Sequence, residues 1–243
     1  MATLVAAVRS IAAYLAVSLY VAIAAPVGMA LALTFRWKSL LYVLGHWGVA
    51  IGTSLAGIRT RVAGREHVPP GQAVVFCSNH QSNIDPPILF QALHPRLHVL
   101  FKRELTKLPL LGKAFQIGGF VPIDRGSREQ SMAAIDQAAA SLRAGNTFLT
   151  FPEGTRSRTG ALLPFKRGPF LMALKAQVPV VPVAIQGGTA SMRKGSPIVR
   201  PTTVSVRIGR PVETRGMAVS DREALADTVR SRVEELLALG PVT

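Results

Sequence analysis

The feature that most constrains this chain is the absence of charge over a long stretch near its N-terminus. No charged residue occurs from position 10 to 35, between Arg9 and Arg36, and a second uncharged stretch covers 39–58. A membrane helix needs about 20 consecutive apolar residues, so the first stretch is long enough to cross a bilayer. A cleaved signal peptide is disfavoured, because its apolar core has only about 7–15 residues and here a second hydrophobic segment follows at once. We therefore predict a hydrophobic two-helix membrane motif over 1–60.

The two segments are not uniformly apolar. Pro26 and Gly28 interrupt the first, and the second contains His46, Trp47 and four glycines. A hairpin that dips into one leaflet fits as well as two full spans, and a helical pair buried in a soluble core is a third interpretation. Basic residues flank both segments with no acid before Glu66, which favours an anionic, cytoplasmic leaflet. We therefore predict location in the inner (cytoplasmic) membrane, with the rest of the chain on the cytoplasmic side.

The charge balance indicates an anionic partner. The 243 residues include 28 Lys and Arg against 13 Asp and Glu, which leaves a net charge of +15 at pH 7, and membrane headgroups or phosphorylated substrates suit this charge. Nucleic acid fits least, because the basic residues are spread along the chain and neither a zinc-finger spacing nor an RNA-binding aromatic signature occurs. The single cysteine, Cys77, cannot form an internal disulfide and lies in an apolar run. We expect it to be a buried strand residue rather than a reactive thiol.

From about residue 61 the pattern changes to short β-rich runs that alternate with amphipathic stretches. This alternation is typical of an α/β domain with a mostly parallel sheet flanked by helices, and we assign 61–243 to it. An amphipathic segment with Leu225, Val229 and Val233 on its apolar face predicts a structural C-terminal helix. The predicted strands are 72–77, 97–101, 119–123, 147–151, 180–185 and 203–208.

Two polar clusters follow predicted strands, and the first contains a histidine and a carboxylate. His80 and Asp85 lie in one short loop after the strand 72–77, and open α/β sheets bind ligands at the carboxyl ends of their strands. A histidine accepts a proton near neutral pH, and a carboxylate on its other ring nitrogen stabilises the imidazolium. The pair therefore predicts a general base, with the attacking hydroxyl on the substrate because no nucleophile motif surrounds it. The competing interpretation is that Asp85, followed by Pro86, caps a helix.

The second cluster runs from Phe151 to Arg156. Pro152 and Gly154 shape a tight turn, and such a turn can aim backbone amides at an anion or an oxyanion. Glu153 and Arg156 have the groups to bond each other, to bind a substrate hydroxyl and phosphate, or to do both. By itself a turn of this composition is a weak signal.

Taken together, these residues resemble the glycerolipid acyltransferase family, in particular the 1-acyl-sn-glycerol-3-phosphate acyltransferases. The family's His-x-x-x-x-Asp block is similar to His80 and Asp85. The other three family blocks resemble the segments 119–125, 151–156 and 180–185. The four segments occur in the family order over about residues 75–190, and this combination is specific although the last block alone is not.

The resemblance implies the glycerolipid acyltransferase fold and acyl transfer from a thioester donor to the free 2-hydroxyl of 1-acylglycerol 3-phosphate (lysophosphatidic acid), which gives phosphatidic acid. His80 would be the base and Asp85 its orienting partner, without an acyl-enzyme. Acyl-CoA or acyl carrier protein would be the co-substrate, the acceptor would come from the membrane, and no metal or other cofactor is expected. For Lys102 a solvated surface lysine is an equal alternative. The substrate-binding residues would be Lys102, Arg125, Glu153, Gly154, Thr155 and Arg156.

Three other functions are also compatible with the sequence. Acyl transfer to another lysolipid, such as a lyso-ornithine lipid, would differ only in its substrate profile. A lipid thioesterase or hydrolase would release free fatty acid without an acceptor. A non-catalytic protein that binds anionic membranes would keep its function after His80→Ala, and it explains the two polar clusters least well.

Overall fold

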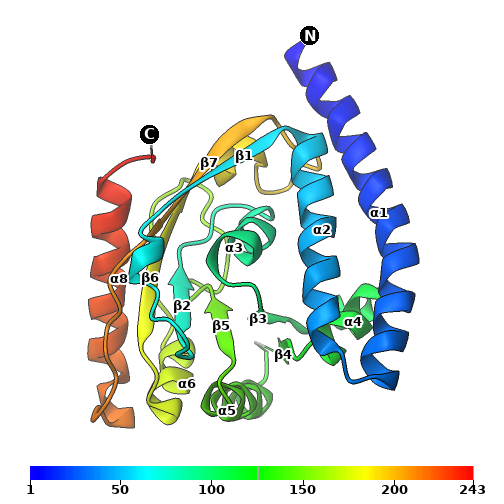
Figure 1. The fold of residues 1–243 in the computed structure, drawn as a ribbon. Helices are drawn as coiled ribbons and strands as arrows, with labels where there is room; N and C mark the ends of the chain where they lie inside the picture. The colour runs from blue at the N-terminus through cyan, green and yellow to red at the C-terminus, as the bar shows by residue number, and fades with distance from the viewer. Residues whose placement is uncertain (125, 243) are drawn as a thin grey trace.

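The structure is a computed structural model that describes residues 1–124 and 126–242. Its N-terminal part is a hairpin of two long helices, α1 (Ala2–Thr34) and α2 (Lys38–Ala56), which stands beside an α/β domain (Figure 1). The Tyr20 hydroxyl of α1 donates a hydrogen bond to the Leu44 carbonyl of α2 at 2.9 Å. Both helices are long and apolar enough to cross a membrane, as judged by length and composition.

Most of the hairpin surface is not covered by protein. Of the most apolar 18-residue window of each helix, 11% is buried in α1 and 17% in α2. The interpretation of a helical pair inside a soluble core is therefore wrong, because such helices are mostly buried. Exposed apolar surface of this extent indicates contact with a membrane or a partner. The exposed apolar side chains of α1 include Val8, Ile11, Leu15, Leu19, Ile23 and Val27.

A seven-stranded sheet forms the centre of the α/β domain in the described part of the chain. Its strand order is β1-β7-β6-β2-β5-β3-β4, and neighbouring strands are parallel except for the antiparallel pair of β6 and β7. The strands are β1 (Ile58–Ala63), β2 (Val75–Ser78), β3 (Leu97–Lys102), β4 (Val121–Ile123), β5 (Thr147–Thr150), β6 (Val180–Gln186) and β7 (Thr202–Ile208).

Helices cover both faces of the sheet. Along β2, Phe76 belongs to one core and Val75 and Cys77 to the other, because successive side chains of a strand point to opposite faces. The hairpin contributes Tyr42 and Ala56 to the core on the Phe76 side. The remaining helices are α3 (Asp85–Leu93), α4 (Leu111–Ile117), α5 (Arg128–Arg143), α6 (Gly168–Ala176), α7 (Gly188–Ser191) and α8 (Arg222–Ala238), with 3₁₀ turns at Arg65–His67, Arg103–Lys107 and Val219–Asp221.

The predicted fold class is confirmed, and each predicted strand is present with its ends shifted by up to three residues. The sequence analysis missed β1. Its residues Arg59 and Arg61 lie on an edge strand paired with β7. Helix α2 ends at Gly57, whose φ of 76° is the left-handed conformation that commonly ends a helix. The sheet therefore begins three residues before the predicted domain start at 61.

Candidate active site

His80 and Asp85 meet in the loop between β2 and α3. His80 Nδ1 lies 2.9 Å from Asp85 Oδ2, with 16% of the histidine side chain exposed and the aspartate fully buried. The imidazole stacks on Phe151, with ring centroids 4.2 Å apart. Because Nδ1 faces the carboxylate, Nε2 is the ring nitrogen left for a substrate hydroxyl.

The Asp85 carboxylate organises the loop rather than the helix that follows. The backbone amides of Gln81 and Ser82 donate to its Oδ2 at 2.6 and 2.7 Å. Helix α3 begins at Asp85 and has no side-chain cap hydrogen bond, although a proline occupies its first turn as predicted. The alternative that Asp85 caps the helix is therefore wrong, because the loop turns the carboxylate back toward residues 80–82.

Gly188, at the start of α7, closes the other side of Asp85. A Cβ at this position would lie 2.4 Å from Asp85 Oδ1 and 3.1 Å from Ser82 Cβ. That Oδ1 atom is buried and has no hydrogen-bond partner among the described residues. A side chain at position 188 would displace the carboxylate, so the β6–α7 junction helps to position the His80–Asp85 pair.

The buried carboxylate of Glu153 connects two loops through hydrogen bonds. The His80 amide donates to its Oε1 at 2.7 Å, and the Leu163 amide donates to its Oε2 at 3.1 Å. Burial raises the pKa of Glu153, and the two amide bonds oppose that rise. The side chain is 3% exposed and both carboxylate oxygens face backbone, so this arrangement favours a positioning role over the predicted substrate contact.

The turn after β5 is closed by the Gly154 amide, which donates to the Phe151 carbonyl at 3.0 Å. Gly154 has a φ of 71°, and a Cβ there would lie 2.9 Å from Lys166 Cε. The turn therefore requires glycine for its backbone conformation.

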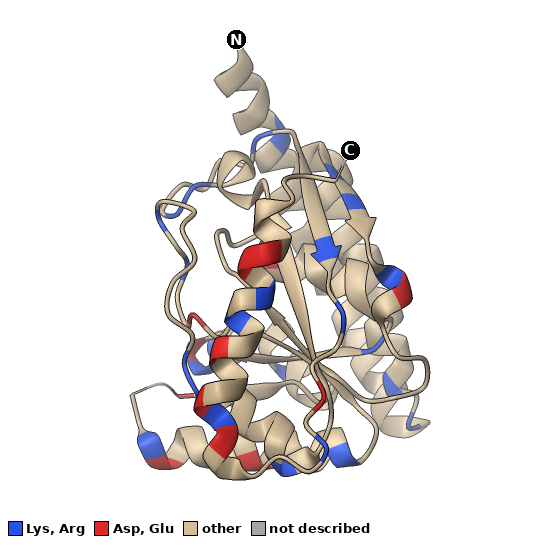
Figure 2. Ribbon diagram, turned by 90° about the vertical axis from the view of Figure 1, so that its left-hand side faces the viewer, with Lys and Arg blue, Asp and Glu red and all other residues tan. Residues whose placement is uncertain are grey.

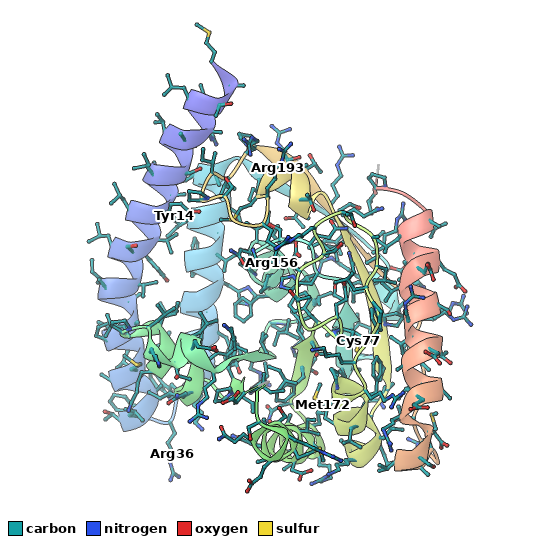
Figure 3. All side chains as sticks on the ribbon, turned by 180° about the vertical axis from the view of Figure 1, so that it is seen from behind. Tyr14, Arg36, Cys77, Arg156, Met172 and Arg193 are labelled. Carbon is teal, nitrogen blue, oxygen red and sulfur yellow. The ribbon has the colours of Figure 1, made fainter. Side chains whose placement is uncertain are left out.

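Cationic side chains gather around this turn. Lys194 Nζ donates to Thr155 Oγ1 at 3.4 Å and to the Arg156 carbonyl at 3.1 Å. Figure 3 shows Arg193 at the same end of the molecule as the N-terminal half of α1 and Arg156 nearer the middle, whereas Arg36 points away at the opposite end. Within the described residues, Arg156 makes no ion pair with Glu153. The turn is thus basic on its exposed side.

Of the other two predicted cations, the structure describes Lys102. Lys102 ends β3, next to β5 in the sheet, and its exposed ammonium pairs with Glu104 at 3.0 Å. Such an exposed pair contributes little energy, so the ammonium remains available for an anion. Arg125 lies outside the described residues.

An apolar cavity of 210 Å³ lies against the turn. It is bounded by β3, β4, β5, α5 and the start of α6, and Lys166 forms part of its wall. Phe151, which stacks on His80, also lines it, so the cavity adjoins the candidate base. Its apolar wall includes Leu100, Ile123, Ile135, Phe151 and Pro169.

Comparison with known proteins identifies the family. Residues 59–186, just over half of the chain, match the family model described as acyltransferase. This chain belongs to the acyltransferase family. It is 37% identical over 178 residues to the mouse 1-acyl-sn-glycerol-3-phosphate acyltransferase alpha, an alignment that covers 72% of this chain and 62% of the mouse protein. The matched part thus spans less than two thirds of that relative's length.

Two further relatives extend the comparison. The 1-acyl-sn-glycerol-3-phosphate acyltransferase of Limnanthes douglasii is 31% identical over 192 residues, covering 77% of this acyltransferase-family chain and 68% of the plant protein. The crystal structure of the 1-acyl-sn-glycerophosphate (LPA) acyltransferase PlsC from Thermotoga maritima superposes with a TM-score of 0.83 at 25% identity, covering 98% of each chain. The structural similarity therefore includes the N-terminal hairpin as well as the acyltransferase domain.

Three site residues of this acyltransferase-family chain escaped the sequence analysis. Ser82 Oγ donates to the Met192 carbonyl at 2.7 Å, Gly188 leaves room for Asp85, and Lys194 contacts the turn. Ser82 stands inside the first motif and could have been considered. Gly188 and Lys194 lie more than a hundred residues from His80 along the chain, so no local spacing connects them to it.

Among the described residues, neither a reactive cysteine nor a cluster of metal ligands is found at this site. Cys77 is fully buried in β2, and burial raises the pKa of its thiol, which keeps it protonated and inert. Within residues 1–124 and 126–242, no three His, Cys, Asp or Glu side chains come together as metal ligands would.

Proposed function

We propose that this chain is a 1-acylglycerol-3-phosphate O-acyltransferase, which transfers an acyl group from a thioester to the 2-hydroxyl of lysophosphatidic acid. The observation that carries the proposal is the 2.9 Å contact between His80 and a fully buried Asp85 at the strand ends of an acyltransferase-family domain. The names of the mouse and Limnanthes relatives support the choice of acceptor.

In the proposed reaction, His80 Nε2 takes the proton of the acceptor hydroxyl as the oxygen attacks the thioester carbonyl. Asp85 stabilises the imidazolium through Nδ1, as the geometry of the pair supports. The tetrahedral intermediate then collapses, the carbon–sulfur bond breaks, and the leaving thiolate takes the proton back from His80. Every bond and proton is accounted for by the two substrates and one imidazole, so the reaction needs no acyl-enzyme and no cofactor.

The turn after β5 is the proposed site for negative charge. Because the Gly154 amide is engaged by Phe151, the Thr155 amide is the better candidate donor to the oxyanion. Gly154 would contribute through the backbone shape of the turn. The proposed phosphate-binding cations are Arg156, Lys102 and Arg125. The 210 Å³ apolar cavity beside Phe151 offers space for part of an acyl chain.

The two apolar helices of the hairpin support a location of this chemistry at a membrane. Lysophosphatidic acid and its product carry long acyl chains, and each CH₂ moved into water costs about 0.8 kcal/mol. A protein anchored through α1 and α2 can take the acceptor and release the product within the bilayer. We propose the inner membrane with the acyltransferase domain on the cytoplasmic side, where acyl-CoA and acyl carrier protein, the two candidate donors, are available.

The test is transfer of a labelled acyl group from acyl-CoA and, in parallel, acyl carrier protein to lysophosphatidic acid in liposomes. Wild type is compared with His80→Ala, and His94→Ala is the matched control because its Nδ1 accepts a bond from the nearby Arg96 amide, away from the site. We expect phosphatidic acid from wild type and His94→Ala, and a loss of at least 10²-fold in His80→Ala. Equal activity in all three proteins would overturn the role of His80.

The alternative functions give different outcomes in the same assay. Transfer only to another lysolipid would change the acceptor and leave the mechanism intact. Free fatty acid released at the same rate with and without acceptor would identify a hydrolase. A folded, membrane-bound protein with neither activity would favour a lipid-binding protein.

A further inference from the structure

A second cavity lies away from the candidate active site, where the hairpin meets the edge of the sheet. It is an open space of 580 Å³ between α1, the end of α2 and the first residues of β1 and β7. Figure 1 shows these segments converging at the end of α2 that is farther from the α1–α2 turn. The residues that line it are Arg9, Ser54, Gly57, Ile58, Arg59, Pro201, Thr202 and Thr203.

The lining of this cavity suits a phosphate. It contains two arginines and three hydroxyl side chains, and no acid among the described residues. Arg59 on β1 is in register with Thr203 on the parallel strand β7, so their side chains point to the same face of the sheet. Guanidinium and hydroxyl groups together provide the donors that phosphate oxygens accept.

Arg9 is held in place but is not satisfied by the protein. Its Nη2 donates to the Ser54 carbonyl at 3.2 Å, and a Cβ at Gly57 would lie 2.9 Å from the same nitrogen. Its Nε atom is buried without a hydrogen-bond partner in the described part of the chain. A buried donor without a partner is costly, so the site lacks an acceptor that an anion would supply.

The surroundings of the cavity point to a lipid as the source of that anion. On α1, the neighbours Val5, Val8 and Ile11 are each at least 55% exposed, and they form an apolar surface beside Arg9. A phospholipid can place its acyl chains along this surface and its phosphate in the cavity. By contrast, α8 carries both acidic and basic residues on its exposed face (Figure 2), which suits water rather than an anion.

We propose that this cavity binds the phosphate of an anionic membrane phospholipid, at a site separate from the transferase centre. The bound headgroup joins α1 to the sheet edge by bridging Arg9 and Arg59. This inference does not depend on the proposed acyl transfer, because the residues involved belong to neither motif of the active site.

The experiment is native mass spectrometry of the full chain in detergent with phosphatidylglycerol, phosphatidylcholine or inorganic phosphate added separately. We expect one phosphatidylglycerol per chain in wild type, and at least tenfold weaker binding in Arg9→Gln and in Arg59→Gln. Arg61→Gln is the matched control, since Arg61 lies two residues further along β1 and its guanidinium reaches the Val242 carbonyl instead. Arg9→Lys, which keeps the charge, should retain part of the binding.

Each outcome bears on the proposal. A loss in Arg61→Gln equal to that in Arg59→Gln would show general attraction to a basic surface and overturn the site. Binding of inorganic phosphate that is lost in Arg9→Gln, without any lipid binding, would keep the phosphate site but overturn the membrane lipid as its ligand. No bound phosphate species in wild type would overturn both. Thermal unfolding of each variant checks that weaker binding is not a loss of folded protein.

Discussion

The resemblance to the acyltransferase family implied that Glu153 binds substrate, whereas the structure indicates that it positions the base His80. The substitution Glu153→Gln distinguishes these two roles. In the structure the two Glu153 oxygens accept the His80 and Leu163 amides at 2.7 and 3.1 Å. Glutamine keeps the size and one acceptor oxygen, but its NH₂ group then faces one of these N–H groups. The variant therefore loses one bond and gains a contact between two donors.

The expected size of the effect follows from these contacts. A hydrogen bond to a charged group contributes about 1.5–3 kcal/mol, and the variant loses one such bond. Burial disfavours the Glu153 carboxylate and raises its pKa. The neutral glutamine avoids this cost, which offsets part of the lost hydrogen-bond energy. We expect Glu153→Gln to lower the free energy of unfolding by about 1–3 kcal/mol. A shift of the His80 backbone by a fraction of an ångström should lower kcat about 10–100-fold, because a misplacement of 1 Å can cost about 10²-fold.

The assay is the initial rate against acceptor concentration at saturating donor, with thermal unfolding of the same samples. We expect kcat to fall while KM for lysophosphatidic acid changes by less than about threefold, the signature of a positioning residue. Glu234→Gln, which removes an exposed carboxylate that pairs with Arg230 on α8 at 3.3 Å, is the matched control and should match wild type. An unchanged kcat with a tenfold higher KM would refute the positioning role of Glu153 and indicate that it binds the acceptor.

Two further changes test the rest of the site, and a third tests the buried His98 on β3. Asp85→Asn should lower kcat about 10²–10⁴-fold with acceptor binding retained, measured in single-turnover acyl transfer, and equal rates would remove the carboxylate from the mechanism. Gly188→Ala should lower kcat at least tenfold, because its Cβ would lie 2.4 Å from Asp85 Oδ1; a fully active, folded variant would show that the carboxylate tolerates displacement. Burial lowers the pKa of His98 to about 4, so the neutral form contributes stability above pH 6.5 that is lost as the pH falls toward 4. Urea unfolding should show the advantage of wild type over His98→Gln shrinking by about 2 kcal/mol between pH 7 and pH 4.5, and a constant difference would contradict a buried neutral imidazole.

Local pattern was enough to predict most of the architecture. The uncharged stretch from residue 10 to 35 predicts a long apolar helix directly, because length and hydropathy are properties of the chain and not of its folding. Apolar runs such as 180–185 gave strands for the same reason. The edge strand β1 escaped, since Arg59 and Arg61 are exposed and lack the apolar signal by which strands are found.

The candidate site divides in the same way. His80 and Asp85 were predictable as a pair because five residues of one loop cannot separate them far. The role of Asp85 was not predictable, since a carboxylate before a proline suits a helix cap equally well. Only the path of the loop decides which donors the carboxylate meets.

The sequence by itself determined which chemical groups this protein has and where they stand relative to strand ends: a histidine, a carboxylate, a glycine turn, nearby cations and a membrane hairpin. The tertiary structure decided which of these groups face one another. It turned Glu153 toward the His80 backbone, placed Gly188 against Asp85, brought Lys194 to the turn, and put Arg9 and Arg59 on the wall of one cavity. The physical reason is that these contacts link segments far apart in the chain, and their distances depend on how the whole sheet packs rather than on any local preference.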